Sequence, residues 1–165
     1  MIAVPQTPIF QDAGGVIPDF SMPATVIGRA ESAKLRGKPF VLYFYPKDDT
    51  SGCTTESCGF RDALPDFSKL GVMVIGVSKD SVASHEKFAR KFDLTFPLAF
   101  DEDGSACEAF GVWVEKSMYG KKYMGIERST FLIDAKGIVR AVWRKVKVPG
   151  HVEEVAKAVR DVMDK

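Results

Sequence analysis

One short segment of the chain places a cysteine where thiol chemistry is favoured. Residues 43–58 read YFYPKDDTSGCTTESC, in which a buried strand is expected to end at Pro46 and a helix to begin near Cys53. Unpaired backbone N–H groups in the first turn of a helix stabilise an anion, so this position favours a thiolate. Thr50 is a candidate N-cap whose hydroxyl could face the sulfur.

The alternative is that Cys53 is a small buried hydrophobic residue, as most free cysteines are. The context argues against that interpretation, because open α/β sheets carry their sites at the carboxyl ends of strands. A strand, a proline, a polar loop and then a threonine and a glycine precede Cys53 in this order. The segment therefore predicts a reactive thiol.

A second cysteine, Cys58, follows five residues later. In an intact helix the two Cα atoms are roughly 8.6 Å apart, and a disulfide usually requires less than about 7 Å. Either Cys58 is a core residue, or the first helical turns unwind when Cys53 is oxidised. The C-x₄-C spacing differs from the C-x-x-C of thioredoxin-type exchangers, which argues against a plain disulfide oxidoreductase.

The remaining thiol and imidazole groups suit packing better than chemistry. Neither a C-x-x-C nor an H-x-x-x-H pair occurs, so we expect no metal site. His85 shares a helical face with Phe88, which favours a hydrogen-bonded core or boundary histidine. His151 is expected to start the last helix, and Cys107 is expected to pack within a helical stretch.

Alternating strand and helix patterns surround these residues. Strands are expected at 40–45, 72–77, 129–133 and 138–143, the last two joined by a tight turn over 134–137. Apolar residues recur at helical spacing over 60–67, 85–92 and 152–159, although Pro65 should end or kink the first of these helices. The run 144–147 is expected to be a solvated strand face. This order predicts an α/β fold with a central mixed β-sheet flanked by helices.

Length and composition indicate one ordinary globular domain. The chain has 165 residues, and we expect a loose N-terminal lead-in over 1–15 before a single domain over 16–165. Lys and Arg number 23 and Asp and Glu 22, giving a net charge of +1, so nothing favours nucleic acid or an anionic membrane surface. No apolar run is long enough to span a membrane, and no signal peptide is evident, so we expect a cytoplasmic protein.

The motif P-x-x-x-T-x-x-C, formed by Pro46, Thr50 and Cys53, is similar to the active-site motif of the peroxiredoxins. The wider stretch FYPKDDTSGCTTESCGFRD resembles their bacterioferritin comigratory protein, or peroxiredoxin Q, branch. Further similar segments follow in the same order at 17–23, 76–88, 96–104, 110–134 and 145–155. The resemblance runs from about residue 16 to the C-terminus.

The resemblance implies a thioredoxin-like fold and a thiol-dependent peroxidase of hydrogen peroxide and organic hydroperoxides. It assigns the peroxidatic role to Cys53, with Pro46, Thr50 and Arg128 completing the catalytic set, and the resolving role to Cys58. The expected product is a Cys53–Cys58 disulfide that thioredoxin or glutaredoxin reduces, with no cofactor. Ser51 departs from the proline often found at that position, which we expect only to soften the loop.

Thiolate formation alone accounts for little of such an activity. An unperturbed thiol is only about 3% ionised at neutral pH, so full ionisation gains about thirtyfold. A thiolate with a lower pKa is also a weaker nucleophile, and this loss offsets roughly tenfold of the gain. The larger contribution must come from donors aimed at the peroxide, each worth roughly 10²–10³ in rate. We expect Arg128, the Cys53 backbone N–H and the Thr50 hydroxyl to form this cradle, with Pro46 screening the sulfur from water. A non-enzymatic redox switch using the same cysteine is the alternative.

Overall fold

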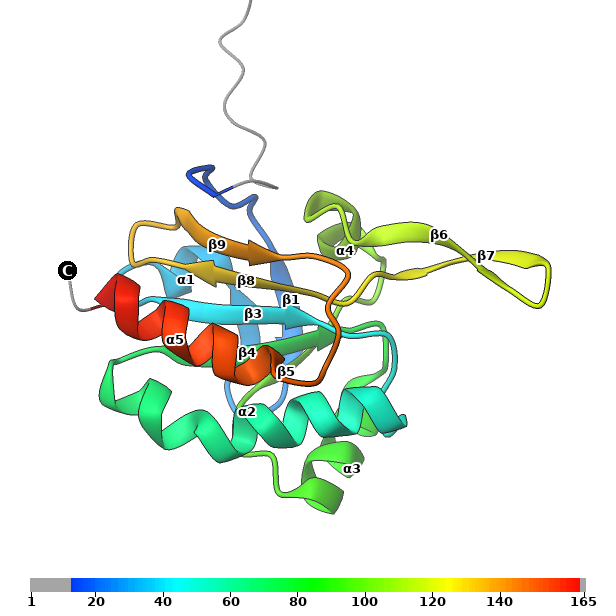
Figure 1. The fold of residues 1–165 in the computed structure, drawn as a ribbon, viewed down its shortest axis with the longest axis horizontal. Helices are drawn as coiled ribbons and strands as arrows, with labels where there is room; N and C mark the ends of the chain where they lie inside the picture. The colour runs from blue at the N-terminus through cyan, green and yellow to red at the C-terminus, as the bar shows by residue number, and fades with distance from the viewer. Residues whose placement is uncertain (1–12, 164–165) are drawn as a thin grey trace, which may run out of the picture.

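A seven-stranded sheet forms the centre of the molecule in a computed structural model that describes residues 13–163 (Figure 1). The strand order is β2-β1-β5-β4-β3-β8-β9. β3, β4 and β5 are parallel, whereas β1, β2, β8 and β9 add antiparallel pairs at the two sides. The strands are β1 (Ser21–Ala24), β2 (Gly28–Glu31), β3 (Phe40–Phe44), β4 (Met73–Ser78), β5 (Leu98–Phe100), β8 (Ser129–Ile133) and β9 (Val139–Trp143).

Helices cover both faces of this sheet. The helices are α1 (Ser32–Leu35), α2 (Ser51–Lys69), α3 (Val82–Phe92), α4 (Ser105–Ala109) and α5 (His151–Met163). Core residues of α2, α3 and α5 pack on one face, and those of α1 and α4 pack on the other. The expected α/β architecture with a central mixed sheet and flanking helices is confirmed.

The central strand β3 supplies side chains to both cores. Phe40, Leu42 and Phe44 point into the core beneath α1 and α4, while Val41 and Tyr43 point towards α2 and α5. All five residues of β3 are at most 2% exposed, as expected for a strand covered on both sides. This continuous burial fixes the strand firmly, so the loop that leaves its carboxyl end has a rigid starting point.

A two-stranded hairpin projects beyond the same end of the sheet (Figure 1). It consists of β6 (Trp113–Met118) and β7 (Lys121–Ile126), paired antiparallel from Trp113 with Ile126 to Met118 with Lys121. Its outer half is exposed, including Tyr119 at the tip. The base of the hairpin leads directly to Arg128 and the start of β8.

The expected helix containing Pro65 does not end there. α2 runs from Ser51 to Lys69 with Pro65 inside it. Proline removes one backbone hydrogen bond, to the carbonyl of Arg61, and Pro65 lies on the exposed side of the helix. Because Phe60 and Phe67 are both almost fully buried on either side of the proline, packing holds the helix together across the missing bond.

The expectation of a solvated strand face over 144–147 is wrong. β9 ends at Trp143, and Arg144 turns back over the molecule. Its guanidinium donates to the carbonyl oxygens of Phe110 and Gly111, each at 3.3 Å, and lies 5.4 Å from the ring centroid of Phe131. A cation–π contact and two hydrogen bonds to carbonyl oxygens thus hold the partly buried arginine against the fold.

The sequence predicts a loose N-terminal segment over residues 1–15, of which the structure describes only the last three residues. Residues 1–12 of the expected lead-in lie outside the described residues, and the domain boundary stays a prediction. Gly14 donates its backbone N–H to the Val139 carbonyl at 2.7 Å, and Val139 donates to the Gly15 carbonyl at 2.9 Å. Within residues 13–163, no helix is long and apolar enough to cross a membrane.

Candidate active site

Cys53 lies in the first turn of α2, two residues after the helix begins. The cysteine is 1% exposed. Thr50 holds the N-cap position, where its backbone carbonyl accepts from the Thr54 N–H at 2.8 Å. The sulfur is therefore held next to the N-terminal N–H groups of the longest helix described, at the carboxyl end of β3.

Arg128 is brought to the sulfur by the pairing of two strands. β8 runs antiparallel beside β3 with Ser129 opposite Phe44, so the residue before β8 lies beside the end of β3. From there the Nη2 of Arg128 donates to Cys53 Sγ at 3.3 Å. Cys53 and Arg128 are far apart in the sequence, and the pairing of β3 with β8 is what brings them together.

Gly52 makes room for this guanidinium. A methyl group at Gly52 would lie 3.1 Å from Arg128 Nη2, closer than ordinary side-chain contacts. The glycine is therefore explained by close approach, since a side chain at this position would push the guanidinium away from Cys53. The sequence analysis did not identify Gly52, although a glycine next to the reactive cysteine was the available signal.

Thr50 and Pro46 make no hydrogen bond to the sulfur among the described residues. The Thr50 hydroxyl donates to the Lys47 carbonyl oxygen at 2.9 Å and makes no side-chain capping bond to α2. Pro46 is exposed and directly follows the last buried residue of the strand segment, Tyr45. Both residues thus lie in the loop that carries the chain from β3 to Cys53.

Cys58 lies in the same helix as Cys53 and is partly exposed. The three cysteines are all free thiols. Cys107 is fully buried in α4, as expected for a packing residue. Burial raises the pKa of the Cys107 thiol far above its usual value, and a hydrogen bond and charge from Asp101 raise it further.

Glu56 completes the site on the buried side of Arg128. Its Oε1 accepts from Arg128 Nη1 at 2.7 Å, and the carboxylate is fully buried. Burial raises the pKa of Glu56 to about 7, although the charge and hydrogen bond of Arg128 act to lower it. The sequence analysis missed this residue, yet Glu56 follows Cys53 by three positions and so shares its face of the helix.

The other oxygen of Glu56 has no hydrogen-bond partner among the described residues. The nearest imidazole is that of His151, whose Nε2 is 3.8 Å from Oε2 and 2.8 Å from Thr130 Oγ1. Burial, with the positive charge of Arg128, lowers the pKa of His151 to about 4. His151 starts α5 as expected, but it is also buried against the site, which its position in the sequence did not indicate.

Comparison with known proteins agrees with this geometry. The family model described as AhpC/TSA matches residues 13–142. The chain belongs to this family. Peroxiredoxin Bcp of Bacillus subtilis is 51% identical over 138 residues, covering 82% of this chain and 88% of the relative. Peroxiredoxin Bcp of Escherichia coli is 41% identical over 149 residues, covering 90% and 96%.

Solved structures support the same assignment. Bacterioferritin comigratory protein of Xanthomonas campestris superposes with a TM-score of 0.84 at 42% identity, covering 92% of this chain and 99% of that one. A peroxiredoxin Q variant of Xylella fastidiosa gives a TM-score of 0.86 at 40% identity, covering 92% and 96%. The protein is a peroxiredoxin of the Bcp branch with a thioredoxin-like fold, and hence a thiol peroxidase, rather than a non-enzymatic switch.

A second buried polar cluster lies under the active-site loop of this peroxiredoxin. His85 Nδ1 is 2.8 Å from Asp48 Oδ2, and its Nε2 is 2.9 Å from the Ala99 carbonyl oxygen. Tyr45 donates to Asp48 Oδ1 at 2.6 Å, and Ser84 donates to Oδ2 at 2.8 Å. His85 is therefore the hydrogen-bonded core histidine that the sequence predicted.

This cluster ties down the loop between Pro46 and Thr50. The backbone N–H of Asp48 donates to Asp80 at 2.8 Å, while the Asp48 side chain is bonded to α3 and to Tyr45, which directly follows β3. The middle of the loop is thus fixed on several sides. The loop that leads to Cys53 is therefore anchored at Asp48 by hydrogen bonds of both its backbone and its side chain.

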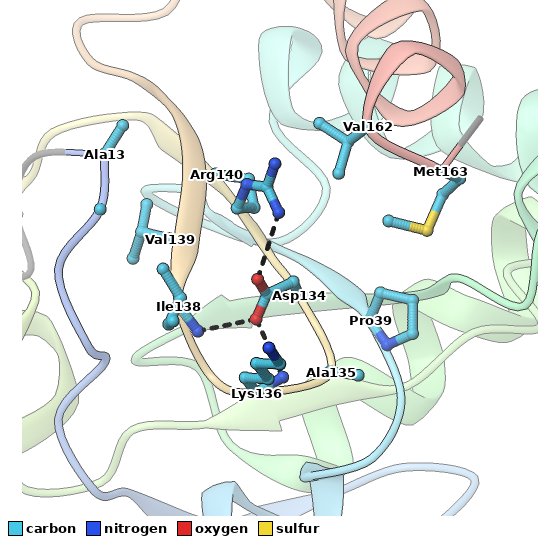
Figure 2. A pocket seen from close by; sticks show the side chains of 11 residues that line it. Ala13, Pro39, Asp134, Ala135, Lys136, Ile138, Val139, Arg140, Val162 and Met163 are labelled. Atoms are coloured by element: carbon cyan, nitrogen blue, oxygen red, sulfur yellow. Dashed lines mark hydrogen bonds and ion pairs between the residues drawn. The ribbon is translucent and has the colours of Figure 1, made fainter. Parts of the chain in front are cut away.

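A separate hollow of about 710 Å³ lies beside the β8–β9 turn (Figure 2), at the opposite end of the sheet from the start of α2 (Figure 1). Asp134 in the β8–β9 turn accepts there from the backbone N–H groups of Lys136 and Ile138 and from Arg140. Pro39, which precedes β3, also lines the hollow. None of the cysteines of the described residues lines it, so its position does not connect it with the thiol chemistry.

Proposed function

We propose that Cys53 is the peroxidatic cysteine and that Arg128 is its principal catalytic partner. The observation that carries this proposal is the donation from Arg128 Nη2 to Cys53 Sγ at 3.3 Å. A guanidinium at this distance stabilises a thiolate and remains positioned for the negative charge that develops on the departing oxygen. The helix N-terminus adds a second, weaker stabilisation of the same anion.

The reaction balances with one thiolate, one peroxide and one proton. The Cys53 sulfur attacks the terminal oxygen of ROOH, and the S–O bond forms as the O–O bond breaks. The departing RO⁻ takes a proton from solvent and leaves as ROH, while the sulfur becomes a sulfenic acid. Water results when R is hydrogen, and an alcohol results when R is alkyl.

The remaining cradle consists of the Thr50 hydroxyl, the Cys53 backbone N–H and Pro46. A hydroxyl that donates to a carbonyl still accepts, so Thr50 can receive the O–H of the peroxide while bonded to Lys47. Pro46 presents an apolar ring without a backbone donor beside the loop. In this role it limits the access of water to the sulfur.

Cys58 is proposed as the resolving cysteine, which requires the start of α2 to unwind. The segment 51–59 reads SGCTTESCG, with two glycines, two threonines and two serines, all poor helix formers. The bond between Tyr43 and Ser57, at 2.8 Å, must break in this step. Phe60 is fully buried and limits the unwinding to the residues before it.

Resolution and recycling then complete the cycle. The Cys58 thiol condenses with the sulfenic acid to form a disulfide and release water. An external dithiol, thioredoxin or glutaredoxin, reduces the disulfide to two thiols and is itself oxidised to a disulfide. We propose a cytoplasmic enzyme that accepts both hydrogen peroxide and alkyl hydroperoxides, in line with the alkyl peroxide reduction named for the relative in Xanthomonas campestris.

Stopped-flow oxidation tests these assignments directly. Wild type, Cys53→Ser, Cys58→Ser and Cys107→Ser are mixed with hydrogen peroxide or cumene hydroperoxide, and the products are identified by mass spectrometry. We expect no sulfur oxidation in Cys53→Ser, a persistent sulfenic acid in Cys58→Ser, and wild-type behaviour in Cys107→Ser. Thioredoxin and glutaredoxin are then supplied separately to determine which restores turnover.

Each assignment has its own contradicting result. Turnover retained in Cys53→Ser would overturn the peroxidatic role. A disulfide between Cys53 and Cys107 would transfer the resolving role to Cys107. A wild-type protein that keeps a free Cys58 thiol beside a stable sulfenic acid would show that an external thiol resolves the intermediate.

A further inference from the structure

Lys116 is the one hairpin residue outside the base whose exposure departs from that of its neighbours. The outer residues of β6 and β7, from Glu115 to Met124, are exposed apart from Lys116, which is half-buried. Glu115 and Ser117 on either side of it are both exposed. A lysine that loses solvent on an otherwise exposed hairpin must pack its side chain along a neighbouring surface.

The stem of Lys116 runs towards the base of the hairpin. Lys116 pairs with Tyr123, and the next pair on the same face is Val114 with Gly125. A methyl group built on Gly125 would lie 3.3 Å from Lys116 Cδ and 3.5 Å from Cε. The side chain therefore crosses Gly125 in the direction of Arg128, three residues further along the chain.

The electrostatic surroundings of Lys116 include residues of the active site. Burial and the positive charge of Arg128 lower the pKa of Lys116, whereas the charges of Cys53 and Glu127 oppose this effect. Lys122 on the opposite face of the hairpin behaves differently, because its ammonium is 3.5 Å from Glu115 and is well exposed. No carboxylate of residues 13–163 lies within ion-pair distance of Lys116.

Two groups that can carry negative charge share the single guanidinium of Arg128. Cys53 as a thiolate and Glu56 as a carboxylate are both almost fully buried, and both bond to the same guanidinium. When both groups are ionised, the two buried anions exceed the one cation, and the uncompensated charge is costly in a poorly solvated site. A second cation nearby removes that imbalance.

We propose that Lys116 supplies the second positive charge of the peroxide site and stabilises both the Cys53 thiolate and the departing alkoxide. It acts through its charge, without touching the sulfur, and Gly125 is the open path that lets its stem reach this position. The proposal rests on Cys53 being the reacting sulfur. It predicts that charge at position 116, and not hairpin structure alone, sets the reactivity of the thiol.

The other groups facing Cys53 define the background for a test by pH. These are Arg128, Glu56 on the same helix, and Tyr43 from β3, whose pKa burial raises far above its usual value, so that its hydroxyl is neutral throughout. Glu56 titrates in the same range as thiols. The measurement is therefore made both in wild type and in a Glu56→Gln background, where this titration is absent.

The experiment compares Lys116→Met with Lys116→Arg and with the matched control Lys122→Met. The pH midpoint of thiolate ultraviolet absorbance and the second-order rate constant for hydrogen peroxide are measured for each. Removal of one nearby positive charge should raise the pH midpoint of thiolate formation by about half to one unit. We expect the rate constant for hydrogen peroxide to fall about three- to tenfold. Lys116→Arg and Lys122→Met should stay within twofold of wild type.

A second variant leaves the lysine in place and blocks its path. Gly125→Val fills the space along which the Lys116 stem lies, and valine is favoured in strands, so the hairpin itself is not weakened. We expect Gly125→Val to reproduce the higher midpoint and slower rate of Lys116→Met. Combining the two substitutions should give no further loss, because both remove the same charge from the site.

Two results would overturn the proposal. The first is a midpoint in Lys116→Met equal to that of Lys122→Met. The second is equal slowing in Lys116→Met and Lys116→Arg with unchanged midpoints, which would show a purely structural role. Turnover that persists in Cys53→Ser would instead refute the assignment of the reacting sulfur, so the two failures are distinguishable.

Discussion

Two buried carboxylates near the active-site loop have opposite hydrogen-bonding situations. Both oxygens of Asp48 accept hydrogen bonds, from Tyr45 on one oxygen and from Ser84 on the other, with His85 at 2.8 Å from the second. Glu56 has one oxygen bonded to Arg128, and its other oxygen has no partner among the described residues. The fully hydrogen-bonded Asp48 cluster fixes the loop. Glu56, which has an unpaired oxygen, can gain or lose a proton near the sulfur.

The difference in hydrogen bonding indicates that one buried carboxylate stabilises the fold and the other tunes the site. A satisfied network loses stability when any member is removed, because each partner is then left unpaired in a dry environment. An incompletely satisfied carboxylate already bears part of that cost, so its neutral form is favoured. The comparison predicts that the Asp48 cluster contributes to stability and that the Glu56 cluster contributes to electrostatics.

The largest expected effect is on catalysis, from Arg128→Ala. Loss of the donor to Cys53 should slow hydrogen peroxide reduction by about 10²–10³. Alkylation by iodoacetamide should slow much less, because no oxyanion develops there. Stopped-flow oxidation and alkylation rates are measured on the same sample, and equal slowing of both reactions would mean that Arg128 only stabilises the thiolate.

Matched carboxyl-to-amide substitutions then test the comparison by stability. Asp48→Asn replaces an acceptor of a fully bonded cluster and should lower the free energy of unfolding by about 3 kcal/mol. Glu56→Gln keeps an acceptor for Arg128 and turns the unpaired oxygen into an amide nitrogen 3.8 Å from His151 Nε2, so we expect a change within about 1 kcal/mol. Urea unfolding above pH 7 measures both, and equal losses would remove the distinction.

Opposite pH slopes are expected from Glu56 and His151. The folded pKa of Glu56, about 7, exceeds the ordinary glutamate pKa of 4.5, so its contribution to stability falls as pH rises through this window. The folded pKa of His151, about 4, is below 6.5, so its contribution falls as pH decreases from 6.5 to 4. The two effects oppose each other where the windows overlap.

Single substitutions should reveal each slope. In Glu56→Gln the His151 effect remains, and stability should rise with pH between 4 and 6.5. In His151→Asn the Glu56 effect remains, and stability should fall between pH 4.5 and 7. Across its pH window, each group is expected to change the free energy of unfolding by about 2 kcal/mol after allowance for solvent screening. Thermal unfolding at several pH values measures them, and parallel curves for both variants would exclude this account.

The smallest effect is expected from Gly52→Ala. The added methyl group would lie 3.1 Å from Arg128 Nη2 and displace the guanidinium slightly, so the peroxide rate should fall a few-fold. Alanine favours a helix over glycine by up to about 1 kcal/mol, so stability should rise. In the Arg128→Ala background the substitution should no longer change the rate, and a persistent effect there would place its cause elsewhere.

The elements closest to the site were predictable from local pattern. The buried strand, the following loop and the helix start near Cys53 all have short-range signals, and the turn before β9 has its Asp and Gly. Arg128 was named through family resemblance alone, since only the register of β3 with β8 brings it to the sulfur. Glu56 had a weak helical-spacing signal, and His151 had none.

Tertiary packing explains most of what the sequence analysis missed. The short strands β1, β2 and β5 have three or four residues each, too few for a periodic pattern. Pro65 opposes a helix locally, yet buried phenylalanines on both sides outweigh that preference. Arg144 belongs to a polar run, and its contacts with the residues just after α4 and with β8 depend on a fold that the run itself does not specify.

The start of α2, which carries Cys53, and the β8–β9 turn lie at opposite ends of the sheet, so the turn offers a practical attachment point (Figure 1). Lys136 has an exposed side chain in that turn, while the adjacent Gly137 is crowded by Arg36 and has a positive φ of 79°. A fluorophore or affinity tag carried on the side chain at 136 would thus sit remote from the reacting sulfur. Immobilised enzyme coupled through this position should keep its access to both peroxide and reductant.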